Sequence, residues 1–320
     1  MARLLLAWLL AASALNALAQ GAWPQKPIRF IVSFPPGGSS DLVARALAPR
    51  LAERLGQPLL VENRPGAGGN IGVDLVAKAP PDGHTLGLAA AGALTINPSL
   101  YPGMPFDPQK DLAPVSLLAM IPIVIVAHPS LGANSLREML ELARARPGQI
   151  SFGTTGAGSS MHLAGELLEM MASVRMVHVP YKGSAPAAAD LAGGQLPLAI
   201  VDLTSALPHI RAGRIRALAV TGAARAVSAP EIPTVAESGL PGFDATGWFG
   251  AVAPAGVPPA VITRLNAEIA DALRAPEIRE RILAGGAEPE SSTPEQFAER
   301  IRSEAAGWAR LIRAAGVKLN

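Results

Sequence analysis

The stretch FPPGGSSD, at residues 34–41, decides how the rest of this chain is interpreted. It joins a predicted strand, 28–34, to a predicted helix that begins at Leu42. Its prolines remove two backbone donors, and its glycines permit a positive φ and a close approach of a ligand to the backbone. Serine and aspartate then favour a helix start, where unpaired N–H groups carry a partial positive charge. The stretch therefore predicts either a small-anion site or an ordinary capped turn.

The same order of strand, glycine turn and helix recurs twice along the chain. A predicted strand at 59–62 enters the turn RPGAGGN at 64–70, and another at 150–152 enters GTTGAGSS at 153–160. Further strands alternate with helical stretches, and the pairs Ser135 with Glu138 and Thr293 with Gln296 stand in the order of a capping box. This alternation predicts an α/β fold with mostly parallel sheets covered on both faces.

Two crossings of the chain predict two lobes with a cleft between them. The apolar stretch 115–127, interrupted by Pro122, is a candidate strand that passes from one lobe to the other. Residues 248–253 are a candidate strand of the first lobe. We therefore expect a first lobe formed by residues 24–121 and 226–320, and a second lobe formed by 122–225.

The first 19 residues resemble a secretory signal. A basic residue at position 3 precedes an apolar run at 4–15 and the small-residue site Ala17-Leu18-Ala19, which predicts cleavage after Ala19. A membrane anchor is the alternative, but the apolar run is short for a span. The chain has no cysteine, which excludes disulfides and a lipid-modified cysteine. We therefore expect an exported protein.

Composition and motifs argue against several other classes of function. Without the signal, 26 of the 27 basic residues remain against 25 acidic ones, which gives nucleic-acid binding little support. The five histidines are scattered without a metal-binding motif, and no turn reads as a dinucleotide fingerprint. We therefore expect no metal and no cofactor.

A secreted hydrolase is the competing enzymatic hypothesis, with Ser159 or Ser160 as nucleophile and His162 as base. The sequence GAGSSMH lacks the G-x-S-x-G pattern of a nucleophile elbow. Ser160 and His162 are also two positions apart, so that on one helix they point to different faces. The pattern therefore favours a protein that is not an enzyme.

Five stretches in this order resemble the Bug-type, TctC-like receptors of tripartite tricarboxylate transporters. They are FPPGGSSD at 34–41, VENRPGAGGNIG at 61–72, FGTTGAGSSMHLAGE at 152–166, VPYKG at 179–183 and IPTVAESGLPGF at 232–243. The resemblance implies a two-lobed periplasmic binding protein of the Venus-flytrap, type II-like kind, with hinge strands. It further implies a monomer that closes on a small carboxylate and delivers it to integral membrane transporter subunits.

The resemblance also implies where the ligand is held. The loop 37–41 would hold one carboxylate from the first lobe, while the turn 156–160 would meet the other end from the second. Serines 39 and 40 depart from the family pattern, as does Pro49, and the serines are expected to tune ligand choice. The full set of expected ligand-binding residues is Gly37, Gly38, Ser39, Ser40, Asp41, Ala67, Asn70, Ala90, Ala91, Thr155, Gly156, Ser159, Ser160, His162, Tyr181, Lys182 and Asp202.

Several of these residues have a structural alternative. Asp41 would repel an anion, so it either caps its own helix or contacts a ligand ammonium group. His162 either makes a structural hydrogen bond or contacts ligand, and Lys182 is either a surface charge or an aid to an anionic ligand. A periplasmic sensing partner, rather than a transporter, is the second functional alternative, because both would use the same cleft.

Overall fold

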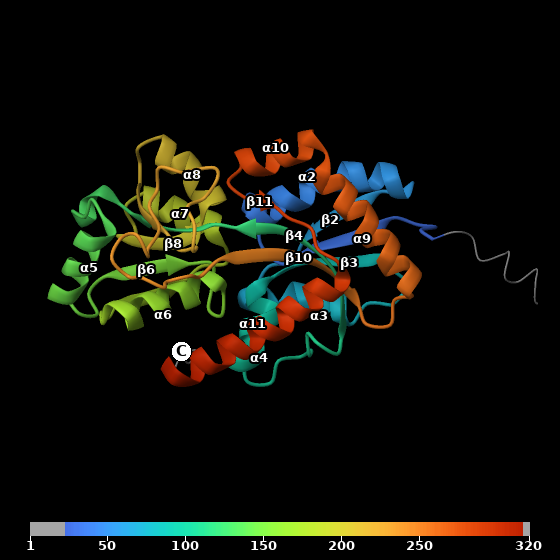
Figure 1. Cartoon of the computed structure of the whole chain (residues 1–320), viewed down its shortest axis with the longest axis horizontal. Coiled ribbons are helices and arrows are strands. Elements are labelled where there is room, and N and C mark those ends of the chain that lie inside the picture. The colour runs from blue at the N-terminus through green and yellow to red at the C-terminus, as the bar shows by residue number, and fades with distance from the viewer. Residues whose placement is uncertain (1–22, 316–320) are drawn as a thin grey trace, which may run out of the picture.

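A computed structural model describes residues 23–315 as two α/β lobes that lie side by side (Figure 1). The expected secretory signal at residues 1–19 lies outside the described residues. Each lobe is built on its own sheet, and the chain crosses from one lobe to the other and back. Among the described residues, no helix combines the length and apolar character that crossing a membrane requires.

The first lobe contains a six-stranded sheet in the order β11-β4-β10-β3-β1-β2. Its strands are β1 (Ile28–Val32), β2 (Leu59–Asn63), β3 (Thr85–Ala90), β4 (Leu112–Ile121), β10 (Gly247–Pro254) and β11 (Glu288–Pro289). Its helices are α2 (Ser39–Leu55), η1 (Ala67–Gly69), α3 (Asn70–Ala77), η2 (Gly92–Ile96), α4 (Asn97–Leu100), α9 (Pro259–Arg274), α10 (Pro276–Ala284) and α11 (Pro294–Ala315).

The second lobe contains a five-stranded sheet in the order β7-β6-β8-β5-β9. Its strands are β5 (Ile123–Ala127), β6 (Ser151–Thr154), β7 (Val177–Pro180), β8 (Leu198–Asp202) and β9 (Arg216–Val220). Its helices are η3 (Pro129–Leu131), α5 (Leu136–Ala145), α6 (Ser160–Ala172), α7 (Ser184–Ala192) and α8 (Leu203–Arg211).

Both sheets are mixed, whereas the sequence predicts mostly parallel pairing. The strands of the βα units are parallel, as in the pairs β1 with β2 and β6 with β7. The strands near the crossing are antiparallel, because β4 leads the chain out of the first lobe and its neighbour β10 brings it back. The break between β4 and β5 falls at Pro122, as the interrupted apolar stretch predicts.

Side chains of each sheet alternate between two apolar layers, which is the period of a strand covered on both faces. In β1, Phe30 and Val32 pack into a layer with α2 and α9, while Ile31 packs into the opposite layer with α3 and α11. In β5, Ile123 and Ile125 face the layer under α5 and α6, and Val124 faces the one under α7 and α8. These layers fix the ends of the strands at which the cavity forms.

Residues 226–245, which the sequence analysis assigned to the first lobe, pack against the second sheet. Ala226, Ala229 and Ile232 join one apolar layer of the second lobe, and Val235 and Phe243 join the other. The chain returns to the first sheet with β10 at Gly247. The segment lacks helices and strands of its own, so the sequence offered no period from which to assign it.

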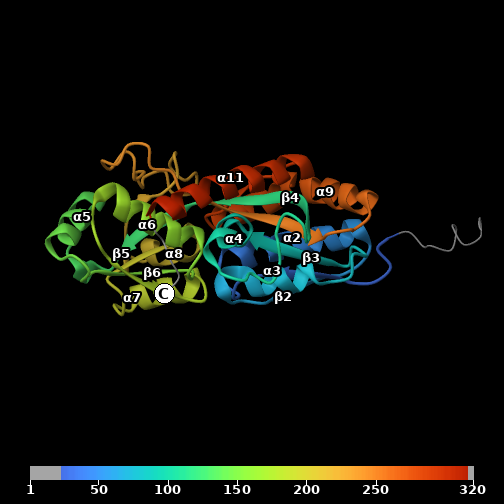
Figure 2. The same ribbon diagram turned by 90° about the horizontal axis from the view of Figure 1, so that it is seen from below.

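Helix α11 runs along the first lobe, and its end reaches the second lobe (Figures 1 and 2). Ile312 of α11 packs with Leu163 of α6 and with Ile96 and Leu100 of the first lobe.

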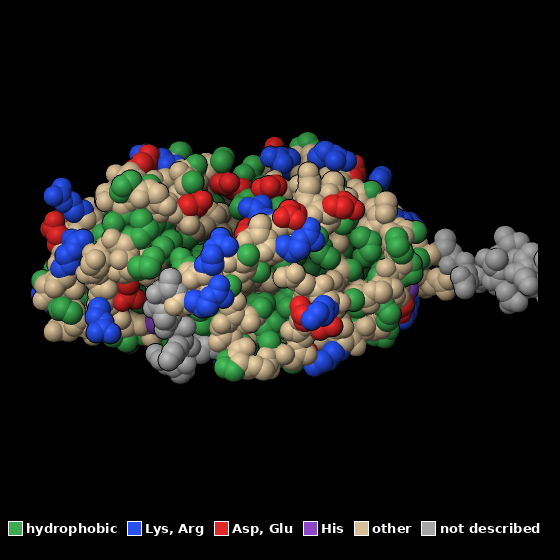
Figure 3. Space-filling view, turned by 60° about the horizontal axis from the view of Figure 1, so that its bottom comes forward, with side chains coloured by type: hydrophobic (Ala, Val, Ile, Leu, Met, Phe, Trp, Pro, Cys, Tyr) green, Lys and Arg blue, Asp and Glu red, His purple; other side chains and the backbone are tan. Residues whose placement is uncertain are grey.

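Figure 3 shows a face on which acidic, basic and hydrophobic side chains are interspersed without a continuous stripe of one charge. Pro49 lies inside α2, which nevertheless continues to Leu55 because its apolar face is buried.

Candidate functional site

A cavity lies between the lobes, with about 560 Å³ of space including its mouth. Its floor is formed by the crossing strands β4 and β10, and its walls come from both lobes. The lining residues are Phe34, Pro35, Gly38, Ser39, Ser40, Gly68, Ala90, Gly92, Ile121, Thr155, Ser159, Ser160, Met161, Gly183, Ser184, Ala185, Pro186, Asp202, Gly247, Trp248 and Phe249.

The first-lobe wall is the start of α2. Gly38 is the N-cap residue, and no side chain caps the N–H groups of the first turn. Ser39 and Ser40 both line the cavity and are only 2% exposed. Because uncapped N–H groups and the helix dipole favour an anion, this wall can accept a carboxylate.

The Asp41 carboxylate does not take part in this anion site, because it is hydrogen-bonded within the first lobe. One of its carboxylate oxygens accepts hydrogen bonds from Arg45 Nε at 2.9 Å and Asn63 Nδ2 at 3.1 Å, and the other from Gly37 N at 3.2 Å. Burial raises the pKa of Asp41, but these hydrogen bonds outweigh it and lower the pKa below its ordinary value. Asp41 does not line the cavity, and its contacts fix the turn before α2.

The start of α6 forms one part of the second-lobe wall. Ser159 caps the helix by accepting a hydrogen bond from His162 N at 3.1 Å, and its hydroxyl donates to Gly156 O at 2.7 Å. Thr155 and Ser160 line the cavity beside it and are 5% and 8% exposed. This turn therefore presents hydroxyl groups from a position that its own hydrogen bonds hold.

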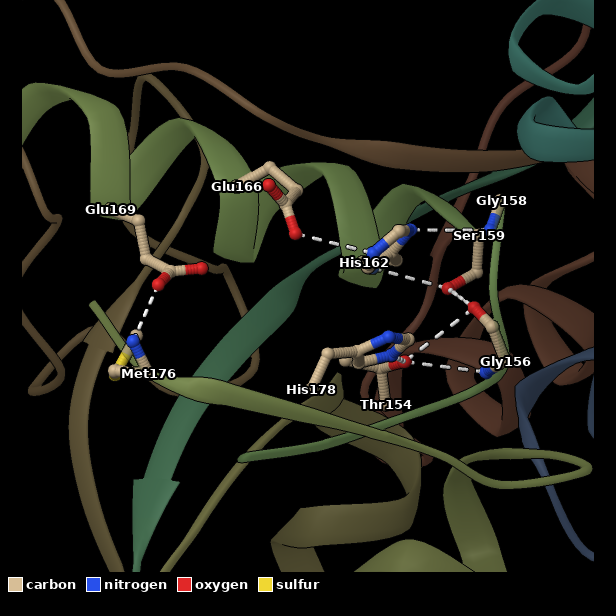
Figure 4. Close-up of polar contacts among 9 residues, drawn as sticks. All are labelled: Thr154, Gly156, Gly158, Ser159, His162, Glu166, Glu169, Met176 and His178. Carbon is tan, nitrogen blue, oxygen red and sulfur yellow. Dashed lines mark hydrogen bonds and ion pairs between the residues drawn. The ribbon is translucent and has the colours of Figure 1, made fainter. Parts of the chain in front are cut away.

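Two stacked histidines support the turn from behind (Figure 4). The rings of His162 and His178 have centroids 4.0 Å apart. His162 Nδ1 accepts from Gly158 N at 3.3 Å and its Nε2 lies 3.3 Å from Glu166 Oε1, while His178 Nε2 is 2.6 Å from Thr154 Oγ1. Burial, with a smaller contribution from the charge of His162, lowers the pKa of His178 to about 3.

Neither nitrogen of His162 is bonded to a serine hydroxyl in the described contacts. Both nitrogens have other partners, and only the backbone N–H of His162 meets Ser159 Oγ. A serine nucleophile needs a base within hydrogen-bond reach. The arrangement therefore gives His162 a structural position and gives a hydrolase no support.

The start of α7 is a second part of the same wall that sequence reasoning missed. Its N-cap is Gly183, and no side chain caps it. Ser184 and Ala185 line the cavity, and the Ser184 hydroxyl accepts a hydrogen bond from Asp202 N at 3.1 Å. The motif VPYKG ends at this glycine, so a glycine directly before a helix start was the signal available.

Asp202 is the one ionisable residue among those that line the cavity. It caps α8 by accepting a hydrogen bond from Ser205 N at 2.8 Å, and it is 4% exposed. Within residues 23–315, His, Asp and Glu nowhere gather in a group of three or more that could hold a metal ion. The cavity thus offers hydroxyl and backbone groups with one acid, and no cationic side chain.

The structure divides the expected ligand-binding residues into three groups. Gly38, Ser39, Ser40, Ala90, Thr155, Ser159, Ser160 and Asp202 line the cavity. Ala67, Gly156, Tyr181 and Lys182 line a neighbouring opening, where the Tyr181 hydroxyl donates to Asp190 Oδ2 at 2.9 Å. Gly37, Asp41, Asn70, Ala91 and His162 line neither space. Lining residues that were not expected include Phe34, Pro35, Gly92, Met161 and the stretch 183–186.

Comparison with known proteins gives one family and several close folds. The family model described as "Tripartite tricarboxylate transporter family receptor" (TctC) matches residues 43–317. The structure is similar to that of the periplasmic binding protein BugD, with 35% identity and a TM-score of 0.88 over 92% of this chain and 99% of that one.

Two further similar structures contain an acid. Rpa4515 of R. palustris, with adipate, is 37% identical with a TM-score of 0.89, and the match covers 92% of this chain and 99% of that one. MatC of Rhodopseudomonas palustris, with bound malate, is 32% identical with a TM-score of 0.84, and the match covers 91% of this chain and 100% of that one.

Proposed function

Because the chain belongs to the TctC family of tripartite tricarboxylate transporter receptors, we propose that this solute-binding protein captures a small carboxylate in the cavity between its lobes. Relatives of known structure contain adipate and malate, both dicarboxylates. The proposed ligand is therefore an aliphatic acid with a carboxylate near each end.

The observation that carries this proposal is the meeting of three helix starts at one cavity. α2 approaches from the first lobe and α6 and α7 from the second, and the starts of α2 and α7 have no side-chain cap. A ligand with a carboxylate at each wall would accept hydrogen bonds from the unpaired N–H groups of both lobes. Hydrogen bonds to a charged group contribute roughly 1.5–3 kcal/mol each, so a few suffice for micromolar affinity, about 8 kcal/mol.

The proposed binding residues follow from their positions in the walls. Ser39 and Ser40 would hold one carboxylate, and Ser160 and Ser184 the other. Asp202 would accept a hydrogen bond from a hydroxyl or ammonium group on the ligand. The expected residues that line neither space would support these walls without touching the ligand.

Location and partners are proposed from the family. Its members include periplasmic binding proteins, and the expected signal at residues 1–19 supports export of this chain to the same compartment. The proposed partners are the membrane subunits of a tripartite tricarboxylate transporter, with the protein acting as a monomer and without catalysis. Capture of a sensor protein instead of transporter subunits by the ligand-loaded protein would favour the signalling alternative.

A thermal-shift screen with malate, adipate, succinate, citrate, aspartate and benzoate tests the binding proposal. By mass action, a ligand at 100 times its dissociation constant stabilises the folded protein by about 2.7 kcal/mol, which raises its melting temperature. We expect at least one dicarboxylate to raise it in a saturable manner. Failure of every acid, confirmed by calorimetric titration, would overturn the proposal.

A further inference from the structure

Residues of the first lobe contact the turn 156–158 of the second lobe, beside the cavity between the lobes. The Tyr101 hydroxyl, at the end of α4, donates a hydrogen bond across the lobes to Ala157 O at 2.9 Å. Asn97, also of α4, donates from Nδ2 to Asn70 Oδ1 at 2.7 Å, while its fully buried Oδ1 has no hydrogen-bond partner among the described residues. That oxygen lies against Gly158.

Glycines make this approach possible on both sides. A Cβ on Gly158 would stand 2.1 Å from Asn97 Oδ1, one on Gly92 would stand 2.6 Å from Gly158 O, and one on Gly68 would stand 2.6 Å from Ala157 O. Cβ atoms essentially never approach other atoms so closely. The backbone of the turn 156–158 therefore fits against the first lobe only while these positions lack side chains.

This turn leads directly into the second-lobe wall of the cavity. It precedes Ser159 and Ser160 at the start of α6 and follows Thr155. Apolar contact between the lobes continues further along α6, where Leu163 packs with Ile96 and Leu100 of the first lobe. A shift of the turn away from the first lobe would carry the hydroxyl groups of α6 with it.

We propose that Gly68, Gly92, Asn97 and Tyr101 form a clasp, a set of first-lobe residues that positions the turn 156–158. Loss of the clasp would lower the affinity for every ligand by the same factor. Asn97 and Tyr101 do not line the cavity and act through α6, while Gly68 and Gly92 line it without a side chain that could distinguish one acid from another. The side chains of the cavity walls decide which acid is preferred. This inference rests on the proposed carboxylate binding between the lobes.

Gly92→Ala is the sharpest test of the clasp. Gly92 does not have a positive φ, and the three nearest heavy atoms that an added Cβ would meet belong to Gly158 and Ser159 of the second lobe. The variant therefore blocks the approach of the lobes without a clash inside its own lobe. Gly307→Ala, in α11, is the matched control, because a Cβ there meets nothing within 4 Å.

Calorimetric titration with malate and with adipate measures the effect on affinity. We expect Gly92→Ala to raise Kd by at least tenfold for each acid that the wild type binds, by the same factor, while Gly307→Ala leaves Kd unchanged. Tyr101→Phe removes one hydrogen bond across the lobes and is expected to raise Kd about three- to tenfold, again equally. Unequal factors for two acids would overturn the proposal, as would unchanged affinity in both variants.

Hydrogen exchange supplies a readout that needs no ligand. We expect amides of residues 156–158 to exchange faster in Tyr101→Phe and Gly92→Ala than in the wild type or Gly307→Ala. Equal exchange in all four proteins would overturn the clasp. Absence of acid binding by the wild type would overturn the proposed function, whereas normal wild-type binding with unaltered variants would overturn the clasp alone.

Discussion

Acidification should destabilise the second lobe through His178. This imidazole stacks on His162 and lies 2.6 Å from the Oγ1 atom of Thr154. Thr154 ends β6, the strand that leads into the turn before α6. Its burial lowers its pKa to about 3, and the charge of His162 contributes to the same shift. The unfolded chain has the ordinary imidazole pKa of about 6.5. Between these values the unfolded state binds more protons, so stability falls as pH falls from 6.5 towards 3.

The magnitude follows from the width of that interval. From pH 6.5 to pH 5 the full shift would cost about 2 kcal/mol, at 1.36 kcal/mol per pH unit. His178 is only partly buried, and water screens its charge, so we expect about 1 kcal/mol. Exposed carboxylates remain ionised at pH 5, which separates this loss from acid denaturation.

Urea unfolding at pH 7.5, 6.5, 5.5 and 5.0 measures the effect in the wild type and in His178→Gln. Glutamine keeps a side-chain amide near Thr154 but cannot take up a proton in this range. Between pH 6.5 and pH 5 we expect the free energy of unfolding to fall by about 1 kcal/mol more in the wild type than in the variant. Above pH 7 the free energy of unfolding of each protein should not change with pH. Parallel pH profiles for the two proteins would refute the reasoning.

Two further predictions concern the walls of the cavity. Ser160→Ala should weaken acid binding about tenfold, because one hydroxyl contact is lost, and calorimetric titration would show this. In an activated-ester assay the variant and the wild type should give the same rate. A turnover that depends on Ser160 would contradict the prediction. Asp41→Ala should lower the free energy of unfolding by about 1–3 kcal/mol, because three hydrogen bonds to a buried charge are lost, yet leave the order of ligand preference unchanged. Urea unfolding and competition titrations check this pair of outcomes, and a changed order would place Asp41 in contact with ligand.

The sequence predicted the elements that depend on local chemistry. The capping pair at the start of α11 is formed as expected, with Gln296 N donating to Thr293 Oγ1 at 3.2 Å and Thr293 N donating to Gln296 Oε1 at 2.9 Å. The break at Pro122 also follows from residue types alone. Helices α2 and α6 form where they were expected, but α2 begins at Ser39, three residues before the predicted Leu42, and α6 begins at Ser160, inside the predicted turn. Each of these features is decided within a few residues of chain.

Features that depend on distant contacts were not accessible in the same way. Gly92 follows a strand that ends in alanines, and nothing local indicates that Gly158, 66 positions later, comes to lie against it. The start of α7 was overlooked because a lone glycine before a serine is common, and only the cavity shows what it faces. Asp41 and His162 were ambiguous because distant partners, Asn63 and His178, are brought to them by the fold.

The contact between Ile312 of α11 and Leu163 of α6 ties the motion of the lobes to temperature. Any motion that parts the lobes at this point must bring water onto apolar side chains, and the free energy of that hydration carries a large heat-capacity change. Closure should consequently have a more negative heat capacity than the small, polar ligand alone would give. Because apolar association weakens on cooling, the receptor would hold its acid less tightly in the cold than its hydrogen bonds suggest.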